Sequence, residues 1–313
     1  FCVLDNDDYT VIYTKSDTEG LNALANVLIQ DKDDIVLTTR MEHHANDLPF
    51  RRVAKMVYVE VDVLGRINID DIEEELIKAN GKIKVVTITG ASNVTGYITP
   101  IHDIARLAHK YGAVIIVDGA QLIAHREVNL AGNSKDEEID FLTFSAHKAY
   151  APFGSGAIVG KKDYLNEEDP FLSGGGCVAG VFDERLIWTA VPEKYEAGTQ
   201  NFFGAIAMAK ALSDLKNIGF QNIEMHEKLL KDYIINSMKS IKNVIMYGDV
   251  DYTDDRIGVI PFNIKNRDYS EVSIKMATEN AISLRSGKFC AHTYVYRLLG
   301  VSDSDAYRDV ISG

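Results

Sequence analysis

Short apolar runs alternate with helical patterns along the first half of the chain. Several runs are apolar at every position, which is typical of strands that are covered on both faces of a parallel sheet. The runs predict seven strands, over Tyr9–Tyr13, Ile35–Thr38, Met56–Val61, Lys84–Thr89, Ala113–Asp118, Phe141–Ser145 and Ala157–Val159. Between them, apolar residues recur at helical spacing, as in Leu21, Leu24 and Leu28. The alternation predicts an α/β fold with a mostly parallel seven-stranded sheet covered by helices.

The pattern changes after Gly198, where helices and shorter apolar runs are mixed. The elements expected there are a long helix from about Phe202 to Ser240, runs at Val244–Tyr247 and Ile257–Ile264, a helix near Ser270–Asn280, and a run at Ile282–Arg285. This mixture predicts a smaller C-terminal α+β lobe. We place a large domain at residues 1–205 and a small domain at 206–313.

Composition and charge narrow the class of protein. The chain has 46 acidic against 33 basic residues and a net charge of −13, which argues against a binder of nucleic acid. With 46% apolar and 25% charged residues it is an ordinary globular chain, not a disordered or fibrous one. Apolar runs such as Ala113–Val117 are far shorter than the roughly 18 residues of a membrane-spanning helix, so we predict no membrane contact.

Cysteine usage indicates the compartment. Cys2, Cys177 and Cys290 do not make a disulfide framework in a chain of 313 residues, so a reduced compartment is expected, with the cytoplasm as the simplest location. The chain begins at Phe1 rather than Met and ends at Gly313, just after an acidic helical pattern over Ser302–Ile311. We therefore expect a fragment of a longer protein, with further site residues in the missing ends.

Two polar residues at strand ends are candidates for chemistry, because ligands of open parallel sheets bind beyond the carboxyl ends of the strands. Asp118 ends an apolar run, where a carboxylate needs a partner; the alternative is that it only caps the following turn. Lys148 follows the run at Phe141–Ser145. A desolvated lysine amine attacks carbonyl groups and forms Schiff bases; the alternative is a solvated lysine in a turn.

Both residues would serve one cofactor. Pyridoxal 5'-phosphate forms a Schiff base with a lysine and needs an acid beside its ring nitrogen. Its phosphate suits a helix N-terminus, and the segment Ser16–Gly20 opens the helix that begins near Leu21. Asp17 opposes this assignment, because a carboxylate repels a phosphate unless it points away as a helix cap. Capping alone is the alternative for this segment.

Seven short blocks give the chain its resemblance to a known family. They are Ser16–Gly20, Met41–Asn46, Ser92–Gly96, Val117–Gln121, Ser145–Lys148, Tyr195–Thr199 and Arg285–Ala291. In these blocks, which span nearly the whole chain, it resembles class V of the fold-type I pyridoxal-phosphate aminotransferases. Within that class it is most similar to group II cysteine desulfurases and selenocysteine lyases. The resemblance implies a large cofactor-binding domain and a smaller C-terminal domain.

The resemblance also implies roles for individual residues. Lys148 would form the Schiff base, and Asp118 would keep the ring nitrogen protonated, which makes the ring an electron sink. The remaining cofactor contacts that it implies are His43 on the ring face, Asn93 and Gln121 at the ring oxygen, and Thr18, Ser145 and His147 at the phosphate. Thr199 would reach the phosphate of a neighbouring subunit, which implies a homodimer with its sites at the interface.

A metal site is the other interpretation of the histidines. His43 and His44 are adjacent, and adjacent histidines rarely face the same ion. No cluster of acidic residues or cysteines accompanies them. We therefore predict no metal.

Cys290 decides the predicted reaction. In the resembling enzymes the cysteine of this block attacks the substrate sulfur as a thiolate and becomes a persulfide. Arg285 would lie near the substrate, where its guanidinium can hold a carboxylate. The family's main carboxylate-binding arginine lies further downstream, in a block that this sequence does not contain. The alternative for Cys290 is a buried, inert cysteine.

Some positions depart from the family, and they put the substrate in question. The departures are Ser16 and Asp17 for a glycine and a threonine, Lys194 for a frequent arginine, and Lys288-Phe289 for a histidine pair. We predict a desulfurase or selenocysteine lyase acting on a free amino acid, with a possible sulfur-acceptor protein. Two alternatives stay open: an aminotransferase or epimerase in which Cys290 is a bystander, and a non-catalytic scaffold of the same fold.

Overall fold

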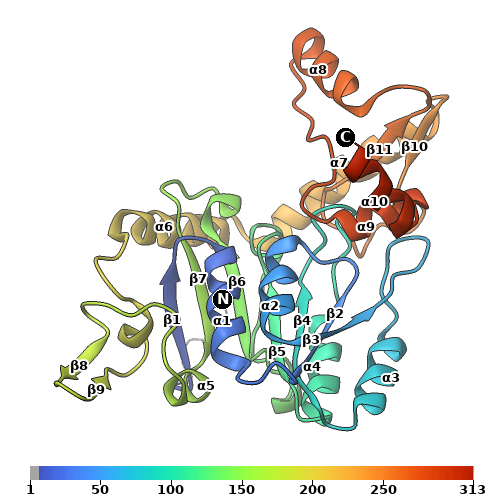
Figure 1. Ribbon diagram of the computed structural model, residues 1–313. Coiled ribbons are helices and arrows are strands. Elements are labelled where there is room, and N and C mark those ends of the chain that lie inside the picture. Colours follow the sequence, from blue (N-terminus) through green and yellow to red (C-terminus); the bar gives the residue numbers. More distant parts are fainter. Residues whose placement is uncertain (1–6, 313) are drawn as a thin grey trace.

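A seven-stranded sheet forms the centre of the molecule (Figure 1). The computed structural model describes residues 7–312, so Cys2 lies outside the described residues. The strands are β1 (Tyr9–Thr14), β2 (Ile35–Thr39), β3 (Lys55–Val59), β4 (Ile83–Thr89), β5 (Val114–Asp118), β6 (Phe141–Ser145) and β7 (Gly156–Lys161). Their order is β1-β7-β6-β5-β4-β2-β3; β7 pairs antiparallel with β1 and with β6, and the other pairs are parallel. The predicted sheet is confirmed, with every strand end within two residues of its prediction.

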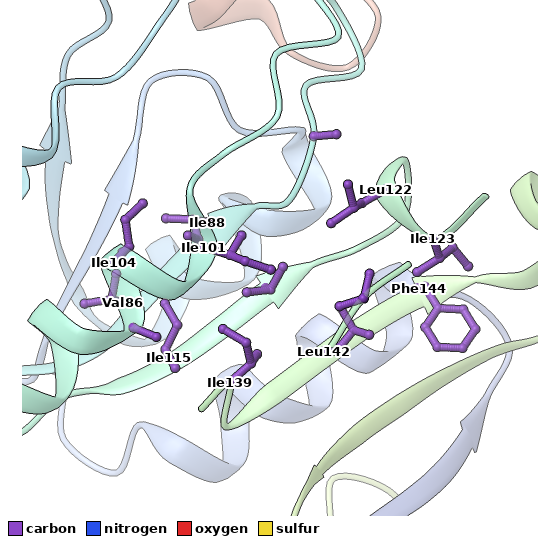
Figure 2. Packing of buried hydrophobic residues seen from close by; sticks show 14 of the residues in the cluster. Val86, Ile88, Ile101, Ile104, Ile115, Leu122, Ile123, Ile139, Leu142 and Phe144 are labelled. Carbon is purple, nitrogen blue, oxygen red and sulfur yellow. The ribbon is translucent and has the colours of Figure 1, made fainter. Parts of the chain in front are cut away.

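Helices cover both faces of this sheet. On one face, Val85 and Ile116 pack with residues of α1 (Asp17–Leu28) and α2 (Leu48–Val53). On the other, alternate strand residues pack against α3 (Ile69–Ala79), α4 (Ile101–Lys110) and α6 (Phe202–Ile218). Figure 2 shows Ile101 and Ile104 of α4 beside Val86, Ile88 and Ile115 of the strands. Burial on both faces explains why the strands are apolar at successive positions.

The C-terminal elements gather beside the upper end of the sheet in Figure 1. They are α7 (Phe220–Lys239), β10 (Val244–Met246), β11 (Phe262–Ile264), α8 (Tyr269–Asn280), α9 (His292–Leu299) and α10 (Asp303–Ser312). The predicted α+β character is confirmed, but three details were wrong. The long helix is two helices, because Gly219 at φ 88° ends α6. The run Ile282–Arg285 forms no strand, and α9 was not predicted.

The connections contain further short elements. They are α5 (Lys162–Glu167), the hairpin strands β8 (Val178–Val181) and β9 (Leu186–Trp188), and the 3-10 turns η1 (His44–Asn46), η2 (Leu122–Ala124), η3 (Lys135–Glu137), η4 (Ala146–Ala149) and η5 (Glu193–Tyr195). The β8–β9 hairpin, which was not predicted, extends away from the sheet in Figure 1. None of the helices between residues 7 and 312 has both the length and the apolar character needed to cross a membrane.

Buried polar contacts tie the C-terminal elements to the edge where the parallel strands end. Arg256 is buried and its Nε donates to the carbonyl oxygen of Thr95 at 2.6 Å. The Tyr294 hydroxyl, in α9, donates to the carbonyl oxygen of Gly65 at 2.6 Å. A buried guanidinium and a buried phenol are costly without such partners. These bonds therefore hold the segment before α9, which carries Arg285 and Cys290, against this edge.

Candidate functional site

The carboxyl ends of β5 and β6 and the start of α1 meet at one place. Asp118 ends β5, Ser145 ends β6, and Lys148 lies in η4 directly after Ser145. The backbone N–H of Asp17, the first residue of α1, donates to Ser145 Oγ at 2.8 Å. Gly156 permits this approach, because a Cβ there would lie 2.8 Å from the carbonyl carbon of Ser16. The structure thus brings together the predicted carboxylate, the predicted lysine and the predicted anion-binding helix start.

Asp118 is buried, with 3% of its surface exposed. Its Oδ1 accepts a hydrogen bond from the backbone N–H of Ala120 at 2.9 Å, so the turn-capping interpretation describes a real contact. Burial raises the pKa of Asp118, and this bond together with the Lys148 ammonium offsets part of the increase. Carboxylate oxygens accept more than one hydrogen bond each, so the cap leaves capacity for a further N–H donor.

His43 is a neutral imidazole beside Lys148. Its pKa is lowered to about 4 by burial first, and then by the nearby Lys148, His44 and Arg285. Its Nδ1 accepts a hydrogen bond from the backbone N–H of Ala45 at 3.1 Å, which leaves the proton on Nε2. His43 therefore lies near both the candidate lysine, Lys148, and the candidate substrate-binding arginine, Arg285. It is uncharged and has an N–H to donate.

A buried polar network holds the turn that carries His43, and the sequence pattern did not reveal it. Glu42 is 2% exposed; it accepts hydrogen bonds from the Thr39 hydroxyl at 2.6 Å and from Asn46 Nδ2 at 2.7 Å. Asn46 Oδ1 in turn accepts from the Thr87 hydroxyl at 2.5 Å, on β4. The signal available in the sequence was that Glu42 directly precedes His43, a residue already singled out. The network joins the His43 turn to β2 and β4.

Glu42 should make stability fall with rising pH. Burial raises its pKa from 4.5 to about 8, so the folded state resists ionisation of a carboxyl that ionises freely when unfolded. Its contribution is fully present below about pH 4.5 and is lost as the pH rises towards 8. We compare the free energy of unfolding of Glu42→Gln with that of the unchanged protein, measured by urea unfolding. Between pH 5 and pH 9 this difference should shift by at least about 1 kcal/mol in favour of the variant. Parallel curves for the two proteins would contradict this, and the exposed Glu279→Gln is the control.

The segment that carries Cys290 is fixed to two strand-end loops. The carbonyl oxygen of Cys290 accepts from the backbone N–H of His44 at 2.6 Å, and that of Phe289 accepts from Asn93 Nδ2 at 2.8 Å. Phe289 and Cys290 have φ values of 53° and 54°, a left-handed conformation that a non-glycine residue adopts only where its surroundings enforce it. Cys290 is exposed, so the alternative of a buried cysteine is wrong.

A cavity of about 460 Å³ adjoins this segment. Asn93, Gln121 and Arg285 line it together with Phe289 and largely apolar residues of the C-terminal elements. Arg285 therefore faces the same cavity as the two residues expected at the cofactor ring, where it could hold a substrate carboxylate. Cys177, by contrast, is buried and its thiol hydrogen-bonds to Gly174, so it has the character of a structural cysteine.

The predicted phosphate residues differ in position. Ser145 is buried, whereas Thr18 and His147 are exposed. Asp17 does not point away as a cap, so its carboxyl still opposes a phosphate: the Ser16 hydroxyl caps α1 by accepting from Glu19 N at 3.3 Å, and the Asp17 side chain is buried. Thr199 is exposed, and within residues 7–312 no hydrogen bond joins it to the other site residues.

The histidines near Cys290 pack against each other. The rings of His44 and His292 meet edge to face at 4.6 Å between centroids, while those of His43 and His44 are 6.4 Å apart. Over the described range 7–312, no group of three or more His, Cys, Asp or Glu side chains is placed to hold a metal ion.

Comparisons with known proteins agree with this geometry. The chain is 33% identical over 302 residues to a cysteine desulfurase of Haloferax volcanii, covering 94% of this chain and 68% of the relative. It is 35% identical over 303 residues to a probable cysteine desulfurase of Staphylococcus epidermidis, covering 94% and 70%. A solved cysteine desulfurase from Thermococcus onnurineus superposes with a TM-score of 0.81 at 28% identity, over 93% of this chain and 72% of that one.

The family model described as aminotransferase class-V matches residues 3–304, nearly the whole chain. The cysteine desulfurase CsdA from Escherichia coli has the same fold, with a TM-score of 0.81 at 26% identity over 93% of this chain and 71% of that one. The resemblance noted in the seven sequence blocks is confirmed. The chain belongs to the aminotransferase class-V family, in which the relatives and structural neighbours named here are cysteine desulfurases.

Proposed function

We propose that this protein is a pyridoxal-phosphate-dependent cysteine desulfurase that transfers sulfur from free cysteine to Cys290 and releases alanine. The observation that supports this best is the placement of Cys290. This exposed cysteine accepts a hydrogen bond from His44 through its own carbonyl oxygen, and the preceding residue, Phe289, accepts one from Asn93. Both bonds lie at the edge of the sheet that carries Asp118 and Lys148.

The residues at this edge fit the cofactor that the class V aminotransferases and cysteine desulfurases use. A buried carboxylate with acceptor capacity is available for the ring nitrogen at Asp118, and Lys148 supplies the amine. Neutral His43 suits the ring face, with Asn93 and Gln121 for the ring oxygen. Thr18 and Ser145 lie at the start of α1, where a phosphate is favoured, and His147 follows Ser145 by two residues. When bound, pyridoxal phosphate supplies an electron sink for the electrons of the substrate's α-carbon.

The chain's own groups then divide the work. The Arg285 guanidinium binds the substrate carboxylate in the cavity. Lys148 Nζ takes the α-proton and can return it to the product. The Cys290 thiolate attacks the substrate sulfur, so that an S–S bond forms as the substrate C–S bond breaks. A proton replaces the sulfur on the β-carbon, which gives alanine and a persulfide on Cys290.

Selenocysteine would react by the same route, since the attacked atom changes from sulfur to selenium and the groups stay the same. An aminotransferase or epimerase would need Asp118 and Lys148 but not Cys290. A non-catalytic scaffold is suggested by the buried Asp17 alone. The exposure of Cys290 and the backbone anchors at Cys290 and Phe289 favour the desulfurase over both.

Assembly and partners belong to the same proposal. Phe202, Phe203 and Ile206 in α6 are 63%, 79% and 68% exposed, and Asn201 Nδ2 joins this segment to Phe153 by donating to its carbonyl oxygen at 2.6 Å. Such an apolar patch is typical of an interface between subunits. It lies next to Thr199, which supports a homodimer in which Thr199 reaches the partner's phosphate.

We further propose the division into a large domain, 1–205, and a small domain, 206–313, since the elements from α7 onward gather away from the strands (Figure 1). The boundary falls within α6, whose Met208 and Leu215 pack with the sheet. The free cysteines Cys177 and Cys290 support a reduced, cytoplasmic location. An exposed Cys290 would allow a sulfur-acceptor protein to reach the persulfide.

The test is the reaction balance of the protein supplied with pyridoxal phosphate, cysteine and an excess of dithiothreitol. We expect sulfide and alanine in equal amounts, measured by a colorimetric sulfide assay and by amino-acid analysis. An aminotransferase would instead yield a keto acid, and an epimerase would yield D-cysteine without sulfide. Binding of pyridoxal phosphate with none of these products would support the scaffold and overturn the proposed function.

A further inference from the structure

A buried carboxylic acid lies at the start of α1, where the proposed function places the cofactor phosphate. Asp17 is 4% exposed and is the first residue of the helix. It does not cap the helix, because the Ser16 hydroxyl does so. Its backbone N–H donates to Ser145 Oγ, one of the predicted phosphate ligands, and the next residue, Thr18, is another. Asp17 thus lies next to two of the predicted phosphate ligands, in the first turn of α1.

The surroundings of Asp17 do not compensate a negative charge. The Thr143 hydroxyl on β6, the Asp118 carboxyl on β5 and the Lys148 ammonium in η4 face it, and Oδ1 is buried without a hydrogen bond within the described residues. On its own helix, Glu19 is occupied by the backbone N–H of Lys15. Burial, and then Asp118, raise the pKa of Asp17 well above its usual range, while Thr143 and Lys148 lower it in part. One ammonium therefore faces two buried carboxyl groups.

A phosphate dianion would add further negative charge at the same place. The N-terminus of a helix favours one anion, so an ionised Asp17 and a bound phosphate compete for the same partial positive charge. A neutral Asp17 carries no charge that repels the phosphate. Its buried Oδ1, which has no hydrogen-bond partner within the described residues, can carry the proton.

We propose that Asp17 links occupancy of this anion site to one proton: a phosphate ester binds at the start of α1 when the Asp17 carboxyl is neutral, and the charge of an ionised Asp17 expels the ester. The proposal rests on the cofactor site of the proposed function, and it adds a residue that makes loading of the protein pH-dependent. The resembling enzymes have a threonine at this position. A threonine is uncharged, so it neither repels the phosphate nor takes up a proton when the phosphate binds.

The direction in which pH changes the affinity for the phosphate ester follows from proton linkage. A bound phosphate raises the pKa of Asp17 above its value in the unloaded protein, so binding takes up a proton at any pH between the two values. Affinity is highest below the pKa of the unloaded protein. It falls by up to about tenfold per pH unit as the pH rises above that value.

Calorimetric titration with pyridoxamine 5'-phosphate tests the proposal, because this ligand lacks the aldehyde and forms no bond with Lys148. Pyridoxamine, without the phosphate, is the second ligand. The proteins are the unchanged chain, the isosteric Asp17→Asn, Asp17→Thr as a second variant, and Asp70→Asn as a matched control in the first turn of α3, where Asp70 is exposed. Measurements run from pH 6 to 9 in buffers of different ionisation enthalpy, which report proton uptake.

We expect the Kd of the unchanged protein for pyridoxamine 5'-phosphate to rise with pH relative to Asp17→Asn, by up to about tenfold per unit, with uptake of a proton that the variant lacks. Asp70→Asn should follow the unchanged protein, and pyridoxamine should show little of the difference. Parallel profiles with equal proton uptake would overturn this inference and leave the proposed function standing. No binding of the phosphate ester by either the unchanged protein or Asp17→Asn would overturn both. Binding by Asp17→Asn alone would support it.

Discussion

Replacing Cys290 with serine should reduce sulfide release from cysteine by at least about 100-fold. A thiolate attacks sulfur readily, whereas a serine hydroxyl is not ionised near neutral pH and has no comparable reactivity towards sulfur. The anchors of this segment involve the carbonyl oxygens of Phe289 and Cys290, so a side-chain substitution leaves them in place. The loss should therefore be a loss of the nucleophile rather than of the local structure.

Two further readouts make this result specific. Cys290→Ser should still bind pyridoxal phosphate, because none of the residues proposed to hold the cofactor is changed. Cys177→Ser is the matched control, since Cys177 is buried and its thiol hydrogen-bonds to Gly174, away from the proposed site. Sulfide production by Cys290→Ser at the full rate would show that Cys290 is a bystander. It would then favour the alternative of a different pyridoxal-phosphate reaction in the same fold.

The seven strands of the main sheet could be predicted because their burial leaves a pattern in the local sequence. Each is a short run whose successive residues are apolar, and both faces of the sheet are covered by helices. The β8–β9 hairpin lacks such a pattern. Val181 and Ile187 are 69% and 55% exposed, so these strands do not pack into a core that would require a regular apolar pattern. The break between α6 and α7 depended on a single glycine, Gly219, within a sequence otherwise compatible with one long helix.

The site divides in the same way. Asp118 and Lys148 could be identified because each follows an apolar strand, and the ends of neighbouring strands meet. The hydrogen bond from Thr87 to Asn46 joins positions 41 residues apart, and the sequence around either residue does not predict it. The orientation of Asp17 stayed open at the level of sequence because both Ser16 and Asp17 are good helix caps, and packing against Ser145 decides between them.

Replacing Lys148 with alanine should have the largest effect on turnover, a loss of at least about 1,000-fold. In the proposed function this one amine holds the cofactor and moves the α-proton. Its removal also leaves Asp17 and Asp118 without the ammonium that lowers both of their pKa values, so the pKa of each should rise. A more protonated Asp118 is a weaker partner for a ring nitrogen, so the cofactor's electron sink is weakened as well.

Borohydride reduction distinguishes the loss of the amine from general damage. In the unchanged protein loaded with pyridoxal phosphate, reduction should fix the label on the peptide that contains Lys148, and in Lys148→Ala this label should be absent. Lys135→Ala, a substitution of an exposed lysine in η3, should keep both the label and the activity. Activity and a stable label retained by Lys148→Ala would show that another lysine anchors the cofactor. Since Lys148 is the lysine placed beside Asp118 and His43, that result would remove the geometric basis of the proposed site.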